Sequence, residues 1–99
     1  MVIGLSVFEL HVPAARSLKQ KRKVVKSLIE RIHHRFRVSI TETDFHDLHQ
    51  RAEIAIAAVT NSEMEGQRLM DSIRTLLDSQ PEAMLLAWDP QFLVEGEFS

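Results

Sequence analysis

Segments with strand-like and helix-like spacing of apolar residues follow one another along this chain in an order that few folds accommodate. Four segments have the composition or alternation typical of β-strands: residues 2–12, 36–43, 51–60 and 82–89. Two segments repeat their apolar residues with the period of a helix: residues 17–35, and a stretch from Asn61 or Ser62 to Gln80. This order predicts a ferredoxin-like βαββαβ sandwich of the α+β class, with two helices on one face of a four-stranded antiparallel sheet.

The first predicted strand carries apolar side chains on both of its faces. They are Ile3, Leu5 and Val7 on one face and Phe8, Leu10 and Val12 on the other. The change of phase between Val7 and Phe8 predicts a β-bulge or a strand buried on both sides, and hence a central strand. Pro13 ends the strand, because proline cannot donate a ladder hydrogen bond.

Both predicted helices begin after a serine that is suited to cap the backbone. Ser17 is the expected N-cap of the first helix. Ser62, followed three residues later by Glu65, fits a capping box at the start of the second helix. These signals fix where the two helical segments begin.

Lys21 is an exception on the apolar stripe of the first helix. A helical wheel places it close to Val25 and Leu28, among residues that should face the core. We expect its aliphatic stem to be buried while its ammonium reaches solvent at the helix end. A fixed carboxylate partner such as Asp47 is the alternative.

The length of 99 residues fits one domain. We expect this domain to cover residues 1–90 and residues 91–99 to form a loose C-terminal tail with a few anchoring apolar side chains. The chain has no cysteine, which excludes disulfides, zinc–thiolate sites and cysteine nucleophiles. No apolar run approaches the roughly 18 residues of a membrane span, and no basic leader precedes the first strand. We therefore expect a cytoplasmic protein without a membrane partner.

Positive charge is concentrated in one segment of a chain whose formal net charge is −2. Residues 16–37 hold nine of the 12 lysines and arginines and only one of the 14 acidic residues, Glu30. Separation of charge on this scale produces a strong local potential within a single domain. It indicates a negatively charged partner.

The start of the first helix is the candidate binding site. A helix N-terminus is already partly positive, so each exposed cation there destabilises the helix by about 0.3–1 kcal/mol. Free backbone N–H groups of the first turn, together with these cations, would hold a phosphate. The candidate residues for binding an anion or RNA are Arg16, Lys19, Lys21, Arg22, Lys23 and Lys26. The alternative is that they pair with acids of the same chain, such as Asp44, Asp47 or Glu53.

The predicted sheet is not suited to stack bases. RNA-binding domains of this architecture place aromatic side chains on their central strands, whereas the third strand of this chain has none and the chain has no tyrosine. Contacts to RNA would therefore run through phosphates, with strong salt dependence and little sequence preference. Ala55, Ala57 and Ala58 leave a flat surface that a second copy of the chain would cover, so we expect a homo-oligomer.

Metal binding and catalysis have little support in the sequence. Asp44, His46, Asp47 and His49 offer four potential ligands within six residues, but a loop this short rarely directs four side chains at one ion. No serine has a base at a known motif spacing, and the three glycines do not form a phosphate loop. We therefore predict no metal, no cofactor and no enzymatic activity. The roles of His46 and His49 stay open.

Three motifs relate the chain to a known family. They are Ser17-Leu18-Lys19-x-Lys21-Arg22, Lys26-Ser27-Leu28 and Asp47-Leu48-x-Gln50-Arg51-Ala52. In this order they resemble the YlxP-like family, a bacterial domain of unknown function, over about residues 2–88. The resemblance implies a ferredoxin-like fold and a cytoplasmic protein. Genes of the family often lie among those for translation initiation and ribosome maturation factors, which implies RNA or a ribosomal particle as partner. The chain departs from the family pattern at His49, where tryptophan is usual, and at Arg37, where asparagine is common.

These observations favour a small non-catalytic binding module that contacts RNA or a ribonucleoprotein through the basic flank of the first helix. One alternative is a structural homo-oligomer in which the basic helix of one subunit meets an acidic surface of another. A second alternative is a phosphate-binding enzyme of the acylphosphatase type, because such enzymes share this fold and bind phosphate after the first strand, where Arg16 lies.

Overall fold

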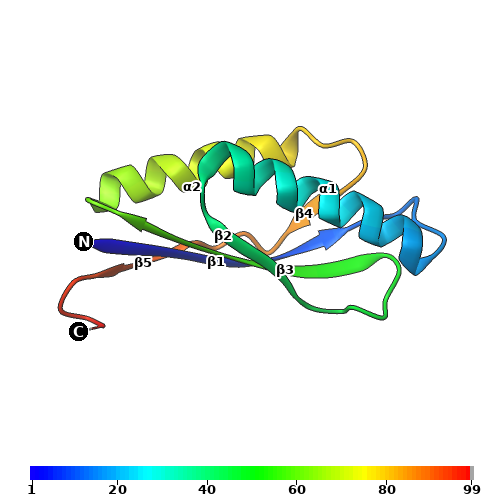
Figure 1. The fold of residues 1–99 in the computed structure, drawn as a ribbon, viewed down its shortest axis with the longest axis horizontal. Helices are drawn as coiled ribbons and strands as arrows, with labels where there is room; N and C mark the ends of the chain where they lie inside the picture. The colour runs from blue at the N-terminus through cyan, green and yellow to red at the C-terminus, as the bar shows by residue number, and fades with distance from the viewer. Residues whose placement is uncertain (99) are drawn as a thin grey trace.

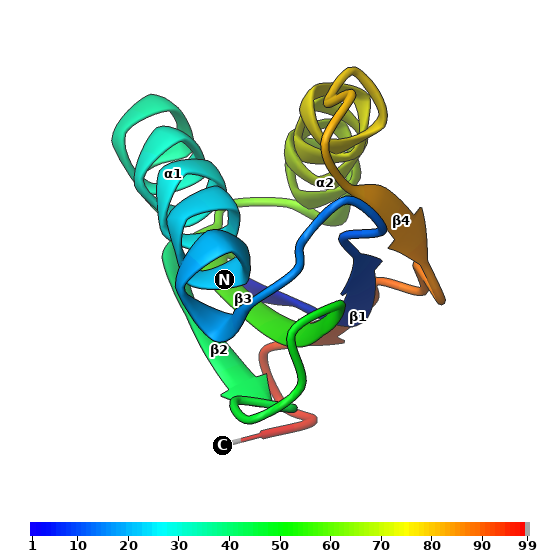
Figure 2. The same ribbon diagram turned by 90° about the vertical axis from the view of Figure 1, so that its right-hand side faces the viewer.

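Two helices lie side by side on one face of an antiparallel sheet (Figure 1; Figure 2). The structure, a computed structural model, describes residues 1–98. In chain order its elements are β1 (Val2–His11), α1 (Leu18–Phe36), β2 (Ser39–Asp44), β3 (Arg51–Thr60), α2 (Glu63–Asp78), β4 (Met84–Leu86) and β5 (Gln91–Val94). The α+β class and the ferredoxin-like βαββαβ arrangement predicted from the sequence are confirmed.

β1 is a central strand, but it contains no bulge. It pairs with β3 in an unbroken register from Val2 opposite Thr60 to His11 opposite Arg51. The apparent change of phase arises because small residues, Gly4 and Ser6, occupy core-facing positions in the first half of the strand. The expected bulge is therefore wrong, and the apolar residues between these positions point to the open face of the sheet.

The fourth position of the sheet is shared by two short strands. β4 pairs with Glu9–His11 and β5 pairs with Val2–Leu5, so both lie on the same edge of β1. Ala87, with a φ of 56°, lies between them, and Pro90 directly precedes β5. Residues 91–94 are thus part of the sheet, which corrects the expectation of a loose tail beginning at residue 91.

The serine N-caps of both helices form as predicted, whereas the Glu65 carboxylate of the predicted capping box accepts the Asn61 N–H at 3.2 Å rather than that of Ser62. Ser17 Oγ accepts the Gln20 N–H at 3.1 Å, and Ser62 Oγ accepts the Glu65 N–H at 3.1 Å. α1 ends at Arg37, whose φ of 53° is left-handed and whose N–H donates to the His33 carbonyl. This left-handed cap separates the helix from β2, which begins three residues later than the sequence indicated.

The core lies between the helices and the covered face of the sheet. Its largest buried apolar side chains are Phe8, Leu10, Ile32, Ile54, Ile56, Met70, Ile73 and Leu77. The other face of the sheet has no helix on it (Figure 2). Among residues 1–98 no helix is long and apolar enough to cross a bilayer.

Candidate nucleic-acid interface

Five of the six predicted binding residues are exposed around the first half of α1. Arg16 precedes the N-cap, and Lys19, Arg22, Lys23 and Lys26 follow within the helix. Because successive helical residues turn by about 100°, these four residues lie on one side of α1. They form the surface that we call the basic flank, which consists of Arg16, Lys19, Arg22, Lys23 and Lys26.

No residue of the basic flank forms an ion pair within residues 1–98. The salt bridges of that region are the Met1 amino group with Glu95, Lys21 with Glu42, Arg51 with Glu9 and Arg74 with Asp78. Two of the proposed internal partners have other contacts: Asp44 accepts the Phe45 N–H at 2.7 Å, and Glu53 accepts the Thr43 hydroxyl at 2.7 Å. The charges of the flank are therefore not neutralised by neighbouring carboxylates.

Lys21 does not belong to this flank, and the expectation that its ammonium reaches solvent is wrong. The residue is 0% exposed. Its Nζ donates to Glu42 Oε2 at 3.1 Å, to the Phe45 carbonyl at 2.8 Å and to the Arg51 carbonyl at 3.1 Å. All three ammonium donors are therefore used, and an outside anion has no access to them. The carboxylate partner is Glu42 rather than Asp47.

The backbone at the start of α1 is less free to bind a phosphate than expected. The Gln20 N–H donates to Ser17 Oγ, and the Arg16 N–H donates to Gln20 Oε1 at 2.6 Å. Two donors of the expected phosphate cradle are thus satisfied within the chain. The cationic side chains, rather than the helix N-terminus, are what this end of α1 offers to an anion.

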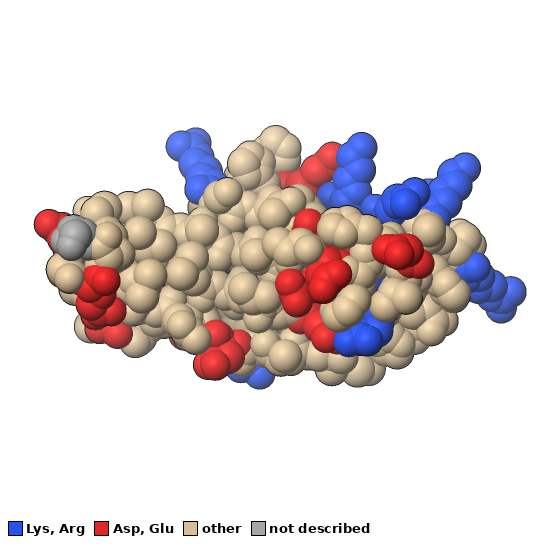
Figure 3. Space-filling view, turned by 90° about the horizontal axis from the view of Figure 1, so that it is seen from below, with Lys and Arg blue, Asp and Glu red and all other residues tan. Residues whose placement is uncertain are grey.

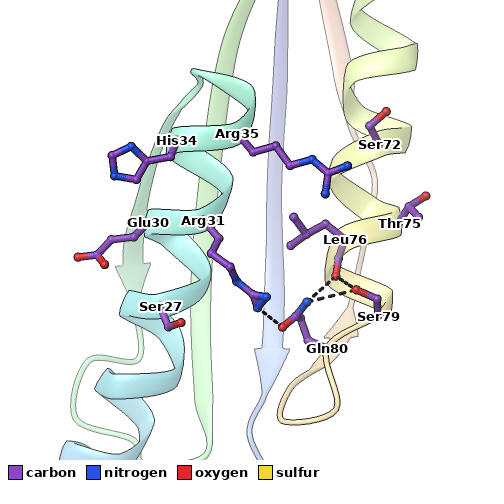
Figure 4. A pocket seen from close by; sticks show the side chains of 10 residues that line it. All are labelled: Ser27, Glu30, Arg31, His34, Arg35, Ser72, Thr75, Leu76, Ser79 and Gln80. Carbon is purple, nitrogen blue, oxygen red and sulfur yellow. Dashed lines mark hydrogen bonds between the residues drawn. The ribbon is translucent and has the colours of Figure 1, made fainter.

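A groove of about 740 Å³ lies between the second half of α1 and the second half of α2 (Figure 4). It is lined by Ser27, Glu30, Arg31, His34, Arg35, Ser72, Thr75, Leu76, Ser79 and Gln80. Figure 4 shows the side chains of Arg31 and Arg35 extending from α1 toward α2, whereas Glu30 and His34 point the other way. The groove is therefore cationic on its α1 side.

Hydrogen bonds to α2 hold one of these two arginines in place. Arg31 Nη2 donates to Gln80 Oε1, and Gln80 Nε2 donates in turn to the Leu76 carbonyl at 3.1 Å and to Ser79 Oγ at 3.2 Å. The Arg35 guanidinium lies over the Phe36 ring, 5.1 Å from its centroid, and makes no side-chain hydrogen bond within residues 1–98. Neither guanidinium is in an ion pair in that region, so both add positive charge beside the basic flank.

Sequence reasoning did not single out Arg31 and Arg35 as candidate binding residues, although the sequence holds a signal for them. Lys23, Ser27, Arg31 and Arg35 recur every four residues, and such a row lies along one side of a helix. A second cavity of about 510 Å³, lined in part by Lys23 and Ser27, continues the row toward the start of α1, where Glu82 also lines it. The cationic surface of α1 is thus wider than predicted.

The open face of the sheet has a different chemistry from α1. Figure 3 looks onto this face and shows an uncharged surface crossed by acidic groups, with most basic side chains projecting beyond its edges. Phe8 is buried against the helices, so β1 and β3 place no Phe, Tyr or Trp side chain on the open face. Ala58 also faces the core, which corrects the expectation that it shares a flat surface with Ala55 and Ala57.

The histidines of the chain do not gather into a ligand cluster. In the part of the chain that the structure describes, no three His, Asp or Glu side chains are placed to hold a metal ion. His46 Nε2 lies 3.3 Å from the Glu42 carbonyl oxygen, and His33 Nδ1 lies 2.9 Å from the Val38 carbonyl oxygen. The cations of α1 are therefore the candidate site.

Comparison with known proteins finds similar sequences along most of the chain. The profile of a family described as "Protein of unknown function (DUF503)" matches residues 3–89. The "Uncharacterized protein YlxP" of Bacillus subtilis (strain 168) is 36% identical over 81 residues, which are 82% of this chain and 88% of that protein. A solved structure, the de novo designed protein LFR1 1 with ferredoxin fold, is similar with a TM-score of 0.49 and 16% identity, over 96% of this chain and 87% of that one.

Proposed function

This chain belongs to the family described as "Protein of unknown function (DUF503)", and we propose that it is a cytoplasmic, non-catalytic module that binds RNA through the basic flank of α1. The RNA is either free or part of a ribonucleoprotein particle. The observation that carries this proposal is that the five cations of the flank are exposed and have no carboxylate partner within residues 1–98.

The two helix starts support this proposal by their contrast. α2 begins with Glu63 and Glu65, as the positive end of a helix dipole favours. α1 has no acid in its first turn. Lys19 lies in that turn, and Arg22 lies just beyond it. Cations at this position oppose the dipole and cost stability, so their presence favours a role in binding over a role in folding.

The chemistry of the flank fits a phosphate backbone. The guanidinium groups of Arg16 and Arg22 can bind phosphate oxygens in pairs, and the lysines act as point charges. None of these groups reads base edges, so binding depends on charge more than on sequence. Suppose that each of the five cations neutralises one phosphate of a single-stranded RNA. A plot of the logarithm of the association constant against the logarithm of the salt concentration should then have a slope of about −3.5.

The test reverses the charge of the flank and measures RNA binding. A variant with Glu at Lys19, Arg22, Lys23 and Lys26 should lose binding to a fluorescent single-stranded RNA of mixed sequence, followed by anisotropy across a salt series. The fold should persist, because all four residues are exposed. Circular dichroism and thermal melting check this. A variant that binds the RNA as the parent does across the salt series would show that the proposal is wrong.

A matched pair of double variants separates the position of a charge from its amount. Arg22→Glu with Lys26→Glu changes α1, and Arg68→Glu with Arg74→Glu makes the same change in net charge on α2. All four side chains are exposed. We expect the α1 pair to weaken RNA binding much more than the α2 pair. Equal losses would mean that only the overall charge of the protein matters.

The same cations could instead join subunits, and one observation favours keeping this second candidate. Thirteen of the 14 acids lie outside residues 16–37, and several are visible on the open face of the sheet (Figure 3). In such an oligomer the basic flank of one subunit would meet the acids of the next. Light scattering against ionic strength tests this arrangement, because contacts between opposite charges are screened by salt and the complex would dissociate.

A further inference from the structure

The face of the sheet opposite the helices carries exposed apolar side chains, and no helix among residues 1–98 covers it. On this face Val59 is 70% exposed and Val7 and Met84 are each 56% exposed. Leu5 and Leu86 also remain more than one third exposed. These residues occupy positions of β1, β3 and β4 that alternate with core-facing ones. Contiguous exposed apolar surface of this kind marks an interaction site in soluble proteins.

The relief of this face is self-complementary. Leu5 and Val7 of β1 lie directly across the ladder from Ala57 and Ala55 of β3. Beyond them, β2 presents only small polar residues at the corresponding positions, Ser39 and Thr41. Along this stretch the face therefore has a ridge of bulky side chains over β1 beside a furrow over Ala55 and Ala57 of β3 and over β2, and Val59 bounds the furrow at one end. Consider a twofold axis that lies in the contact plane, runs parallel to the strands and passes over the gap between β1 and β3. Rotation about this axis places the ridge of each copy in the furrow of the other.

We propose that this face is the contact between two copies of the chain, packed sheet against sheet as a twofold-symmetric dimer. The strand ladders place the titratable groups Glu9, His11, Arg51, Glu53 and Asp44 on this face, all toward one end of the strands. Arg51 already pairs with Glu9 at 2.7 Å. The rest of the face between the strand ladders is uncharged and can pack against an identical face, whereas an RNA or an anionic membrane would find no free cation on it.

The area of the face suits a dimer of modest stability. β1 is ten residues long, or about 33 Å, and four strand positions span about 19 Å, so the face presents roughly 600 Å² in projection. Stable interfaces of standard size bury about 800 Å² on each partner. An interface below this size is typical of weak association, so we expect the dimer to exchange with the monomer.

This dimer leaves the basic flank free. α1 lies on the side of the sheet away from the contact, so the two flanks would face outward from the dimer (Figure 2). The dimer therefore does not rest on the proposed RNA binding, and each can fail without the other.

Sedimentation velocity of the full chain, from low micromolar to near-millimolar concentration, tests the dimer. We expect a monomer–dimer equilibrium that persists at high salt, because the contact is apolar. Val7→Glu should raise the dissociation constant at least about 100-fold, since the carboxylate would be buried in the contact. The parent and the variant should have the same circular dichroism spectrum, because Val7 is exposed in the monomer.

Met64→Glu is the matched control. Met64 is 62% exposed, which is close to the 56% of Val7. It lies in the first turn of α2, away from the sheet face. This variant should dimerise as the parent does. The proposal is overturned if the parent stays monomeric over the whole range, if Val7→Glu dimerises like the parent, or if high salt dissociates the dimer.

Discussion

Lys21 connects α1 to the two strands that follow it. Its buried ammonium is bound by the Glu42 carboxylate of β2 and by the carbonyls of Phe45 and Arg51, which lie at either end of the β2–β3 connection. A buried charge is tolerated only when it is paired and its hydrogen bonds are complete, and both conditions hold for Lys21. The residue is therefore part of the fold and not of the binding surface.

Replacement of Lys21 by methionine should destabilise the protein. The variant leaves Glu42 without its partner and two carbonyls without a donor, and loss of one member of a buried ion pair costs about 3–5 kcal/mol. Urea denaturation should show a lower free energy of unfolding by about 3 kcal/mol. Lys26→Met, at an exposed position of the same helix, serves as the control and should change stability little. Equal effects of the two variants would contradict the role assigned to Lys21.

Ser6 is a residue at which the native chain is not optimal. It is 2% exposed on the core-facing side of β1, and its Oγ has no hydrogen-bond partner in the described part of the chain. A buried polar group without a partner costs about 1–3 kcal/mol. We therefore expect Ser6→Ala to raise the free energy of unfolding by about 1 kcal/mol, measured by thermal and urea unfolding. A loss of stability would show that the hydroxyl has a partner, such as an ordered water.

At the scale of elements, sequence periodicity predicted the order and type of six segments but not the end of the sheet. Residues 51–60 match β3 at both ends, and both helix caps form. β5 has no local signal of comparable strength, because its four residues follow Pro90 and contain only a short apolar run. These residues form a strand because the edge of β1 beside them is free to pair. The local sequence of residues 91–94 does not indicate which strand edge is free.

β5 is attached to the core through Phe92. A Cβ at Gly66 of α2 would lie 3.1 Å from the Phe92 ring, and a Cβ at Gly4 of β1 would lie 3.5 Å from it. The two glycines therefore leave the space that this ring occupies between helix and sheet. Phe92 thus anchors β5 beside the N-terminal half of β1.

Phe92→Ala should loosen this edge of the sheet. Truncation of a fully buried phenylalanine to alanine lowers the free energy of unfolding by about 3–5 kcal/mol. Phe92 is half-buried, so its truncation should lower it by about 2 kcal/mol. Hydrogen exchange of the amides that pair β1 with β5 should speed up at the same time. Phe98→Ala is the control, because Phe98 is 37% exposed beyond the strand. Unchanged stability and exchange in Phe92→Ala would mean that residues 91–94 behave as the loose tail expected from the sequence.

For the molecule as a whole, the unpaired cations of α1 and the exposed apolar residues lie on opposite faces. The helix side carries the basic flank and the two arginines of the interhelical groove, and the sheet side carries exposed apolar residues (Figure 3). Counting charges along the sequence was enough to find the cationic segment. It was not enough to sort its members, because only tertiary contacts withdraw Lys21 into the core and direct Arg31 and Arg35 toward α2.

The groove arginines should extend the RNA contact beyond the basic flank. Arg31→Gln with Arg35→Gln removes two cations that have no carboxylate partner in residues 1–98, so the salt slope of single-stranded RNA binding should become shallower by about 1.4. The matched control, Arg68→Gln with Arg74→Gln, removes the same charge from α2. Its slope should change less, because Arg74 is already paired with Asp78 at 3.5 Å. If both pairs change the slope equally, the change reflects the overall charge of the protein and gives no support to an RNA contact in the groove.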